Sequence, residues 1–204
     1  MLRHYGSGMD LELPVPSPAP TVAWLRAMVA RFSAGSDHHR RRALVSAELA
    51  KIDPASLRQL AADTTGSASE VLAQAMGISA GDAVADVARA YHPHTEADES
   101  ADRAVARLVA AFGGVTDELT AARISLLVQS HDATTALVAN ARNHATLADT
   151  LRDDPPLRST RRVRDGQVVM VSLDGHPFGA GTHECPGQAH AIALAEGILA
   201  RRHS

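Results

Sequence analysis

The sequence predicts a mainly α-helical fold with a small β-hairpin near its C-terminal end. Of the 204 residues 45% are hydrophobic but only 3% are aromatic, so small side chains must fill the core, which favours helices over a β-sandwich. Apolar residues recur at three- and four-residue steps along much of the chain. One Asp-Gly pair between two short apolar stretches indicates the hairpin.

The composition excludes several classes of protein. With 20 Lys and Arg against 23 Asp and Glu, the net charge of −3 creates no basic field, so we expect no nucleic-acid partner. The single cysteine, Cys185, excludes an internal disulfide framework and any multi-cysteine zinc or iron–sulfur site. No apolar run reaches the roughly 18 residues that span a bilayer, and no leader pattern opens the chain. We therefore expect a cytoplasmic protein with no membrane partner.

The chain divides into a lead-in and one domain. Residues 1–20 carry four prolines and no apolar periodicity, which predicts an extended segment. The remaining residues, 21–204, are long enough for a single domain with its own core. Within this domain the helical pattern begins at once, over residues 21–32.

Residues that are typical of helix N-termini predict several helices after residue 32. Ser36 and Asp37 are suitable N-caps for a helix from His38 to Leu49. Residues 92–102 are polar and acidic, so we expect a surface loop or the start of a solvated helix there. Similar signals predict short helices after Asp53-Pro54, after Ser67 and after Ser79.

The strongest helical pattern runs from Thr116 to about Asn143. Its apolar residues cover most of the circumference, which predicts a helix buried in the middle of the protein. A polar block at residues 129–135 interrupts this pattern. Buried polar groups cost free energy unless they find partners, so the block indicates either a functional site or a polar stripe on a surface helix.

The C-terminal part begins with a short helix that ends near Arg152, where Asp-Asp-Pro-Pro forces a break. Two β-like stretches, Leu157–Val163 and Gln167–Leu173, flank the turn at Asp165-Gly166. A last amphipathic helix extends from Pro186 to about Arg201.

A distinctive loop, residues 177–187, precedes this last helix. Its three glycines indicate unusual backbone dihedrals or a close approach to something flat. Cys185 stands at the N-terminal end of the helix, where dipole and free amides stabilise a thiolate. A thiolate on a tight glycine loop suits the axial position of an iron porphyrin.

This loop resembles the cysteine-loop signature of the cytochrome P-450 (haem-thiolate monooxygenase) superfamily, F-G-x-G-x-H/R-x-C-x-G. The resemblance implies haem b (iron protoporphyrin IX) as cofactor, with Cys185 as the axial ligand of its iron. A zinc site built from His176, His183, Cys185 and His190 is an alternative, but it leaves the glycine spacing unexplained. The defining positions of the signature are all met here, by Phe178, Gly179, Gly181, His183, Cys185 and Gly187.

Further segments are similar to haem-contacting parts of the same family. His38 and Arg42 match the helix whose histidine and arginine pair with haem propionates, and their i, i+4 spacing puts them on one helix face. A solvated basic patch is the alternative there. Arg162 resembles the arginine that reaches a propionate, although the adjacent Arg161 could serve instead, and His183 is implied as another propionate contact.

The polar block 130–134 resembles the family's central-helix motif G-x-D/E-T-T, which implies catalytic roles for Asp132 and Thr134. The family's acid–alcohol pair delivers protons to dioxygen, but here Ala133 occupies the alcohol position. Residues 149–152 resemble the motif E-x-x-R, with Asp149 in place of Glu.

The chain is short for the family: Asp149 and Cys185 are separated by 185 − 149 = 36 positions, about half the usual spacing. The resemblance therefore implies a compact, shortened cytochrome P-450-like helical fold, with haem between the long central helix and the cysteine loop. Its pocket should be open, small or completed by a second subunit, either in a homo-oligomer or with a partner.

Three functions are weighed. The first is a haem-thiolate oxidoreductase, of the monooxygenase or peroxygenase kind, that tailors a small molecule in natural-product biosynthesis by peroxide-driven or otherwise non-standard chemistry. The second is a non-catalytic haem sensor or accessory protein derived from such an enzyme. The third is a zinc or nucleic-acid module based on residues 38–42 and the scattered histidines. An acid at Asp132, buried above the iron, favours the enzyme over the sensor.

Overall fold

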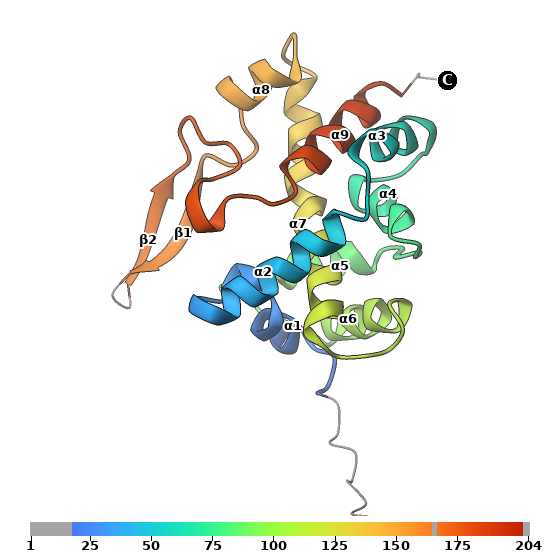
Figure 1. Ribbon diagram of the computed structural model, residues 1–204, viewed down its shortest axis with the longest axis vertical. Coiled ribbons are helices and arrows are strands. Elements are labelled where there is room, and N and C mark those ends of the chain that lie inside the picture. The colour runs from blue at the N-terminus through green and yellow to red at the C-terminus, as the bar shows by residue number, and fades with distance from the viewer. Residues whose placement is uncertain (1–17, 165–166, 202–204) are drawn as a thin grey trace, which may run out of the picture.

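The computed structural model describes residues 18–164 and 167–201, and these are mainly helical, with one small antiparallel sheet (Figure 1). Most of the proposed lead-in, residues 1–17, and the Asp165-Gly166 turn lie outside the described residues. The elements are α1 (Val22–Met28), η1 (Ala30–Phe32), α2 (Gly35–Leu49), α3 (Pro54–Asp63), α4 (Ala68–Ala75), α5 (Ala83–Ala90), α6 (Glu99–Ala111), α7 (Glu118–Ala141), α8 (Leu147–Asp153), β1 (Ser159–Arg164), β2 (Gln167–Ser172), η2 (Gly181–His183) and α9 (Gln188–Leu199).

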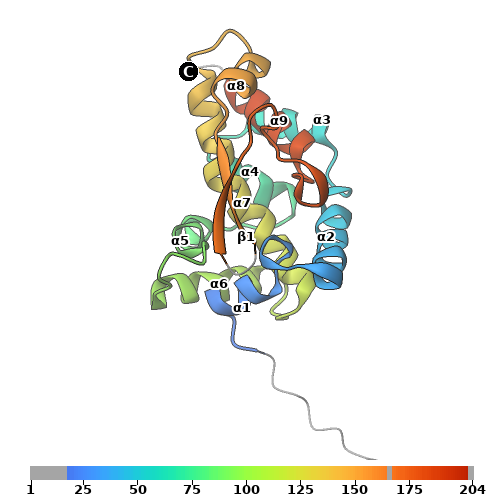
Figure 2. The same ribbon diagram turned by 90° about the vertical axis from the view of Figure 1, so that its left-hand side faces the viewer.

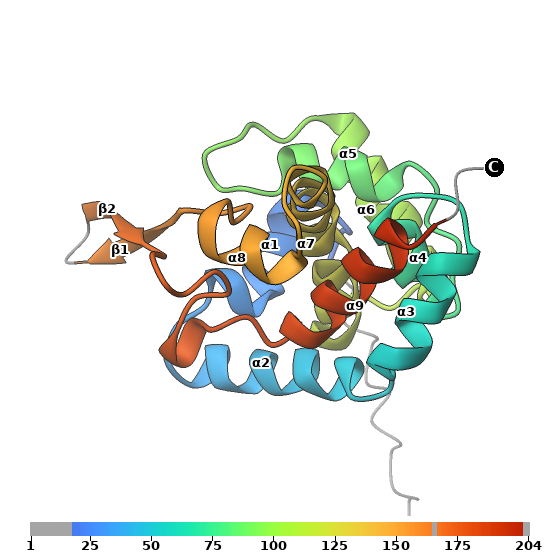
Figure 3. The same ribbon diagram turned by 90° about the horizontal axis from the view of Figure 1, so that it is seen from above.

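Helix α7 passes through the middle of the molecule, as predicted, with α1, α2, α4, α5 and α9 packed around it (Figures 1 and 3). Ile124, Leu127 and Leu137 on this helix are almost completely buried. It begins two residues later than expected, because the Asp117 carboxylate caps it by accepting the Thr120 N–H at 2.7 Å.

The start of α2 differs from the prediction. The helix begins at Gly35, after Ala34, rather than at His38 with Ser36 and Asp37 as caps. The Asp37 carboxylate lies in the first turn and pairs with Arg40 at 2.9 Å, so it favours the helix through its charge instead of capping it.

N-capping side chains explain where the middle helices begin. The predicted helices after Asp53-Pro54 and after Ser67 are confirmed. The Asp53 side chain accepts the Ser56 N–H at the start of α3, and Ser67 forms a capping box with Glu70 at the start of α4. Asp98 caps α6, whose inner face is buried. The acidic segment 92–102 is therefore a loop that leads into a full helix.

The C-terminal elements cover one side of α7. Strands β1 and β2 form the expected hairpin, which stands to one side of the helices in Figure 1 and faces the viewer in Figure 2. Arg162 is paired with Val169 in its register. Helix α9 packs against α3, as Figure 3 shows from above. The His190 Nε2 lies 3.1 Å from the Leu49 carbonyl oxygen and 2.9 Å from that of Ile52, which ties α9 to the end of α2.

No helix in the described part of the chain is both long and apolar enough to cross a membrane.

Candidate functional site at the cysteine loop

The cysteine loop, residues 177–187, connects the hairpin to α9 and lies beside the start of α2 (Figures 1 and 3). Gly179 and Gly181 have φ of 77° and 69°, a left-handed conformation that favours glycine. The Cys185 N–H donates to the Phe178 carbonyl oxygen at 2.8 Å and closes the loop on itself. The prediction of unusual dihedrals is confirmed at these two glycines, whereas Gly187, with φ of −98°, is ordinary.

Cys185 itself is exposed. The chain around its sulfur nevertheless raises the pKa of the thiol by desolvation, while the Gly187 N–H, Arg42 and Arg31 act in the opposite direction. Helix α9 begins only at Gln188, so the sulfur lies outside its first turn. Cys185 thus lies just before the helix rather than within it, and desolvation opposes the stabilisation of a thiolate that we expect from the helix terminus.

The start of α2 meets the cysteine loop through two histidines. The rings of His38 and His183 lie 4.3 Å apart between centroids, at 53° to one another. Burial lowers the pKa of both imidazoles, and the positive charge of Arg42 lowers both further. Both rings are therefore neutral at pH 7, facing each other beside a cation.

The arginines of α2 have different surroundings. Arg40 and Arg41 pair with the Glu118 carboxylate, at 2.7 and 2.8 Å, and hold the Glu118 pKa down to about 2. Arg42 has no acidic partner among residues 18–164 and 167–201, although it is half-buried. The solvated-patch interpretation thus fits the exposed Arg40, while the charge of the half-buried Arg42 lowers the pKa of His38, His183 and Cys185.

Strand β1 supplies a second cation. Arg162 donates to the Thr160 hydroxyl and the Arg161 carbonyl, both at 3.2 Å, and burial lowers its pKa. Its charge contributes to the lowered pKa of His183, whereas Arg161 is exposed and acts on His92 instead. Of the two alternatives, Arg162 is the one near the cysteine loop.

The sequence prediction missed Arg31, in η1. Its Nη1 donates to Gln129 Oε1 on α7 at 3.3 Å, and its charge acts on Cys185 and Arg162. No motif marks this arginine, because its place in the site depends on a contact 98 residues away along the chain.

The polar block on α7 is divided between two faces. The expectation that Asp132 is buried is wrong, because its side chain is 77% exposed, with the His131 Nε2 at 4.0 Å. Thr134 is 2% exposed and faces the core. These two predicted catalytic residues are on different sides of the helix and do not form a pair. His131 Nδ1 is hydrogen-bonded to the buried Ser69 hydroxyl at 2.9 Å, which fixes its ring against α4.

The structure also shows where the residues of two other expected groups lie. Asp149 and Arg152 pair at 2.7 Å on the surface of α8. The four residues of the zinc alternative do not come together, since no group of three or more His, Cys, Asp or Glu side chains in the described part of the chain is arranged to hold a metal.

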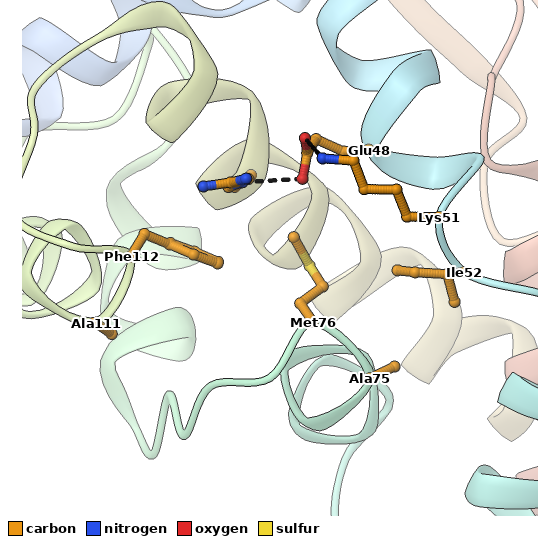
Figure 4. A pocket seen from close by; sticks show the side chains of 8 residues that line it. Glu48, Lys51, Ile52, Ala75, Met76, Ala111 and Phe112 are labelled. Atoms are coloured by element: carbon orange, nitrogen blue, oxygen red, sulfur yellow. Dashed lines mark hydrogen bonds and ion pairs between the residues drawn. The ribbon is translucent and has the colours of Figure 1, made fainter.

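Two cavities can be compared with this site. One, of about 370 Å³, is covered by Glu48, which Figure 4 shows bridging Arg123 and Lys51 above Met76 and Phe112. The other, of about 410 Å³, lies between α8 and the end of the hairpin. Pro177, at the start of the cysteine loop, lines the second cavity, but Cys185 and Asp132 line neither; both are exposed, so each lies on an open face.

No protein-family model, curated protein or solved structure significantly matches this chain.

Proposed function

We propose that this chain is a haem-thiolate enzyme of the cytochrome P-450 type that oxidises a small molecule. The observation that carries the proposal is the convergence of cations without acidic partners on a single cysteine. Arg42 and Arg31 act on the Cys185 sulfur, and Arg162 and Arg42 act on His183 two residues earlier. None of these three arginines has a carboxylate at ion-pair distance within residues 18–164 and 167–201, so together they could bind an anion.

The donor set fits haem b. This cofactor needs one soft axial ligand for iron and partners for two propionate carboxylates. Cys185 would supply the axial sulfur. Arg42 and Arg162 would pair with the propionates, and His38 and His183, whose rings lie 4.3 Å apart, would add hydrogen-bond donors. When bound, the haem iron would supply the redox chemistry that no side chain of this site offers.

Binding would change the protonation of these residues. Cys185 would lose its thiol proton, with the Gly187 N–H donating to the sulfur. Pro186 offers no N–H, so one donor toward the sulfur is absent and the ligand would be more electron-rich. The imidazoles of His38 and His183 would become easier to protonate next to carboxylates.

Asp132 is the residue of α7 that could hold or move a proton on the open face. Its side chain is exposed, Ala133 beside it has no hydroxyl, and Thr134 is directed into the core. Reduction of dioxygen needs ordered delivery of protons, which a lone carboxylate supports poorly. A peroxide arrives already reduced and needs one proton moved between its oxygens, which one carboxylate can do.

The substrate would be a small molecule of the kind tailored in natural-product biosynthesis, reached through the open face. A second subunit that completes the pocket stays a prediction. The hairpin next to the cysteine loop exposes Val168 and Met170, 68% and 61% exposed, which gives a homo-oligomer or partner an apolar surface to cover.

A non-catalytic haem sensor or accessory protein is the second candidate. One observation favours it: Asp132 is largely exposed and lacks the neighbouring alcohol, whereas a proton-delivering acid is expected in a water-excluded site. Both candidates predict haem binding, and only the enzyme predicts turnover.

The experiment is to reconstitute the purified chain with haem and follow styrene oxidation with hydrogen peroxide, or with dioxygen, NADPH and a reductase. We expect peroxide-supported turnover above that of free haem and of a Cys185→Ala variant, and little turnover with dioxygen. Haem binding without turnover in either case would favour the sensor. Failure to bind haem would contradict both.

A further inference from the structure

A cavity outside the cysteine loop brings charged and apolar side chains together. Its volume of about 370 Å³ lies within the range of small-molecule sites. It forms where the ends of α2, α4 and α6 meet α7, and Figure 4 shows Met76 directed toward Glu48 between Phe112 and Ile52. No residue of the cysteine loop lines it, so it is separate from the proposed haem site.

Glu48 holds the two cations of this cavity in place. Its side chain is 8% exposed, and its two carboxylate oxygens have separate partners, Lys51 for Oε1 and the Arg123 Nε, at 2.9 Å, for Oε2. Desolvation raises the pKa of Glu48, but Arg123 and Lys51 outweigh it and lower the pKa overall, so the carboxylate is charged at pH 7. One negative charge therefore faces two positive charges.

The Arg123 guanidinium keeps two donor groups without a partner. Glu48 occupies its Nε, and the centroid of the Phe112 ring lies 5.8 Å from its Cζ. Its two Nη groups have no hydrogen-bond partner within residues 18–164 and 167–201, although the side chain is only 26% exposed. The terminal nitrogens of arginine match the two oxygens of a carboxylate. Arg123 thus offers a fixed pair of donors to a planar anion.

The other walls of the cavity indicate what else the ligand carries. Ile52, Met76 and Phe112 are each only partly buried, so an apolar group placed against them would remove apolar surface from water. Helices α4 and α6 end at this cavity, and the partial negative charge of their C-termini, like that of Glu48, disfavours a second negative charge on the ligand. The cavity therefore suits a ligand with one negative charge and an apolar body.

We propose that this cavity binds a small organic monocarboxylic acid, with its carboxylate paired to the two Nη groups of Arg123 and its apolar part against Met76 and Phe112. The Lys51 ammonium adds a second positive charge at the rim. The site is at the C-terminal end of α2, whereas His38 and Arg42 lie in the first half of that helix. Occupancy of the cavity therefore needs no haem.

The test uses the purified full-length chain without added haem and measures dissociation constants by NMR, from shifts of the backbone amide signals. The probes are hydrocinnamate, its neutral amide, phenethylamine and phenethyl phosphate. Arg123→Gln removes the proposed partner of the carboxylate, and Met76→Trp fills the cavity while it leaves the two ion pairs of Glu48 in place. Arg103→Gln is the matched control, since Arg103 is exposed, pairs with Glu99 and lines neither cavity.

We expect the wild-type protein and Arg103→Gln to bind hydrocinnamate about tenfold or more tightly than its amide, as for a charge-assisted pair. The largest shifts should come from the amides of Lys51, Met76 and Phe112. In Arg123→Gln the ratio of the two affinities should fall to near one, and Met76→Trp should bind neither probe. Phenethylamine and phenethyl phosphate should bind the wild type more weakly than hydrocinnamate.

No binding of hydrocinnamate, equal affinity for the acid and its amide, or tighter binding of phenethylamine or phenethyl phosphate would overturn the inference. A ratio that Arg123→Gln leaves unchanged would do the same. If Arg123→Gln does not fold, Met76→Trp decides, because unchanged binding in that variant would place the acid outside this cavity. Since no haem is added, the failure of this inference would leave the proposed function standing.

Discussion

The imidazole rings of His38 and His183 lie 4.3 Å apart, although 145 residues separate them in the sequence (183 − 38 = 145). One ring belongs to the first turns of α2 and the other to the loop that carries Cys185. Two neutral imidazoles beside Arg42 and Arg162 form a group of donors without an anion. This relationship links the basic helix α2 to the cysteine loop.

The first prediction is that Arg42, unlike the neighbouring Arg40, contributes to haem retention. Replacing Arg42 with Ala should weaken haem retention by about 1–3 kcal/mol, because one charge-assisted pair with a propionate is lost. Arg40→Ala, which removes an arginine paired with Glu118, should leave retention unchanged. Haem transfer to apomyoglobin measures both. Equal effects of the two substitutions would contradict a specific contact between Arg42 and a propionate and would favour the solvated basic patch.

The second prediction concerns pH. Burial lowers the pKa of His38 and His183 in the folded protein, so the unfolded chain, with its pKa near about 6.5, binds protons more readily. The free energy of unfolding of the apoprotein should therefore fall as the pH decreases from 7.5 to 5.5. The Glu118 carboxylate, with a pKa of about 2, does not contribute in this range, because its stabilisation is lost only at lower pH.

Urea unfolding at several pH values measures this slope. A variant with His38→Gln and His183→Gln should show a shallower dependence over the same range. If the slope of the double variant equals that of the wild type, the two imidazoles are not buried against one another in solution.

The third prediction concerns proton transfer at α7. Asp132→Asn should lower peroxide-driven turnover by about 10²-fold or more, because the carboxylate that moves the proton is lost. Ala133→Thr restores a hydroxyl beside the acid and should improve the coupling of dioxygen consumption to product formation. Product yields per peroxide and per NADPH measure the two effects. Efficient dioxygen-driven turnover that is indifferent to Asp132→Asn would contradict this role.

The fourth prediction tests the packing of α9 on α3. A methyl group at Gly197 would meet the Arg58 carbonyl oxygen and lie 2.6 Å from Ala61 Cβ. Gly197→Ala should therefore destabilise the protein by about 1–3 kcal/mol, despite the better helix propensity of alanine.

Gly187→Ala is the matched control for Gly197→Ala. At Gly187 the added methyl group would lie 3.7 Å from the Leu49 side chain, an ordinary contact, so we expect little change in apoprotein stability. Urea unfolding gives both values. Similar stability of the two variants would show that α9 does not approach α3 as closely as described.

Local signals in the sequence predicted much of the fold. The side chains of Asp53 and Ser67 cap helices wherever they occur before a suitable stretch, so α3 and α4 could be predicted from a few residues. The start of α2 could not, because Asp37 pairs with Arg40 instead of capping. For helix α6 the sequence predicted only a loop or the start of a solvated helix, because its first turn is acidic although the face that follows is buried.

The site was predicted less completely than the fold. The cysteine signature placed Cys185, Gly179 and Gly181 correctly on a tight loop. The sequence does not show which of the arginines 40–42 lacks a carboxylate partner, because the position of Glu118 in the fold decides which two are neutralised. The separation of Asp132 from Thr134 does follow from helix geometry, since two residues are about 200° apart around the axis.

The most direct test of the central claim is the absorption spectrum of the reduced, haem-loaded protein with carbon monoxide. A Cys185 thiolate bound to iron predicts the red-shifted Soret band of thiolate ligation in the wild type, and its loss in Cys185→Ser. A wild-type spectrum without that band, or a Cys185→Ser variant that keeps it, would contradict the claim that Cys185 is the axial ligand.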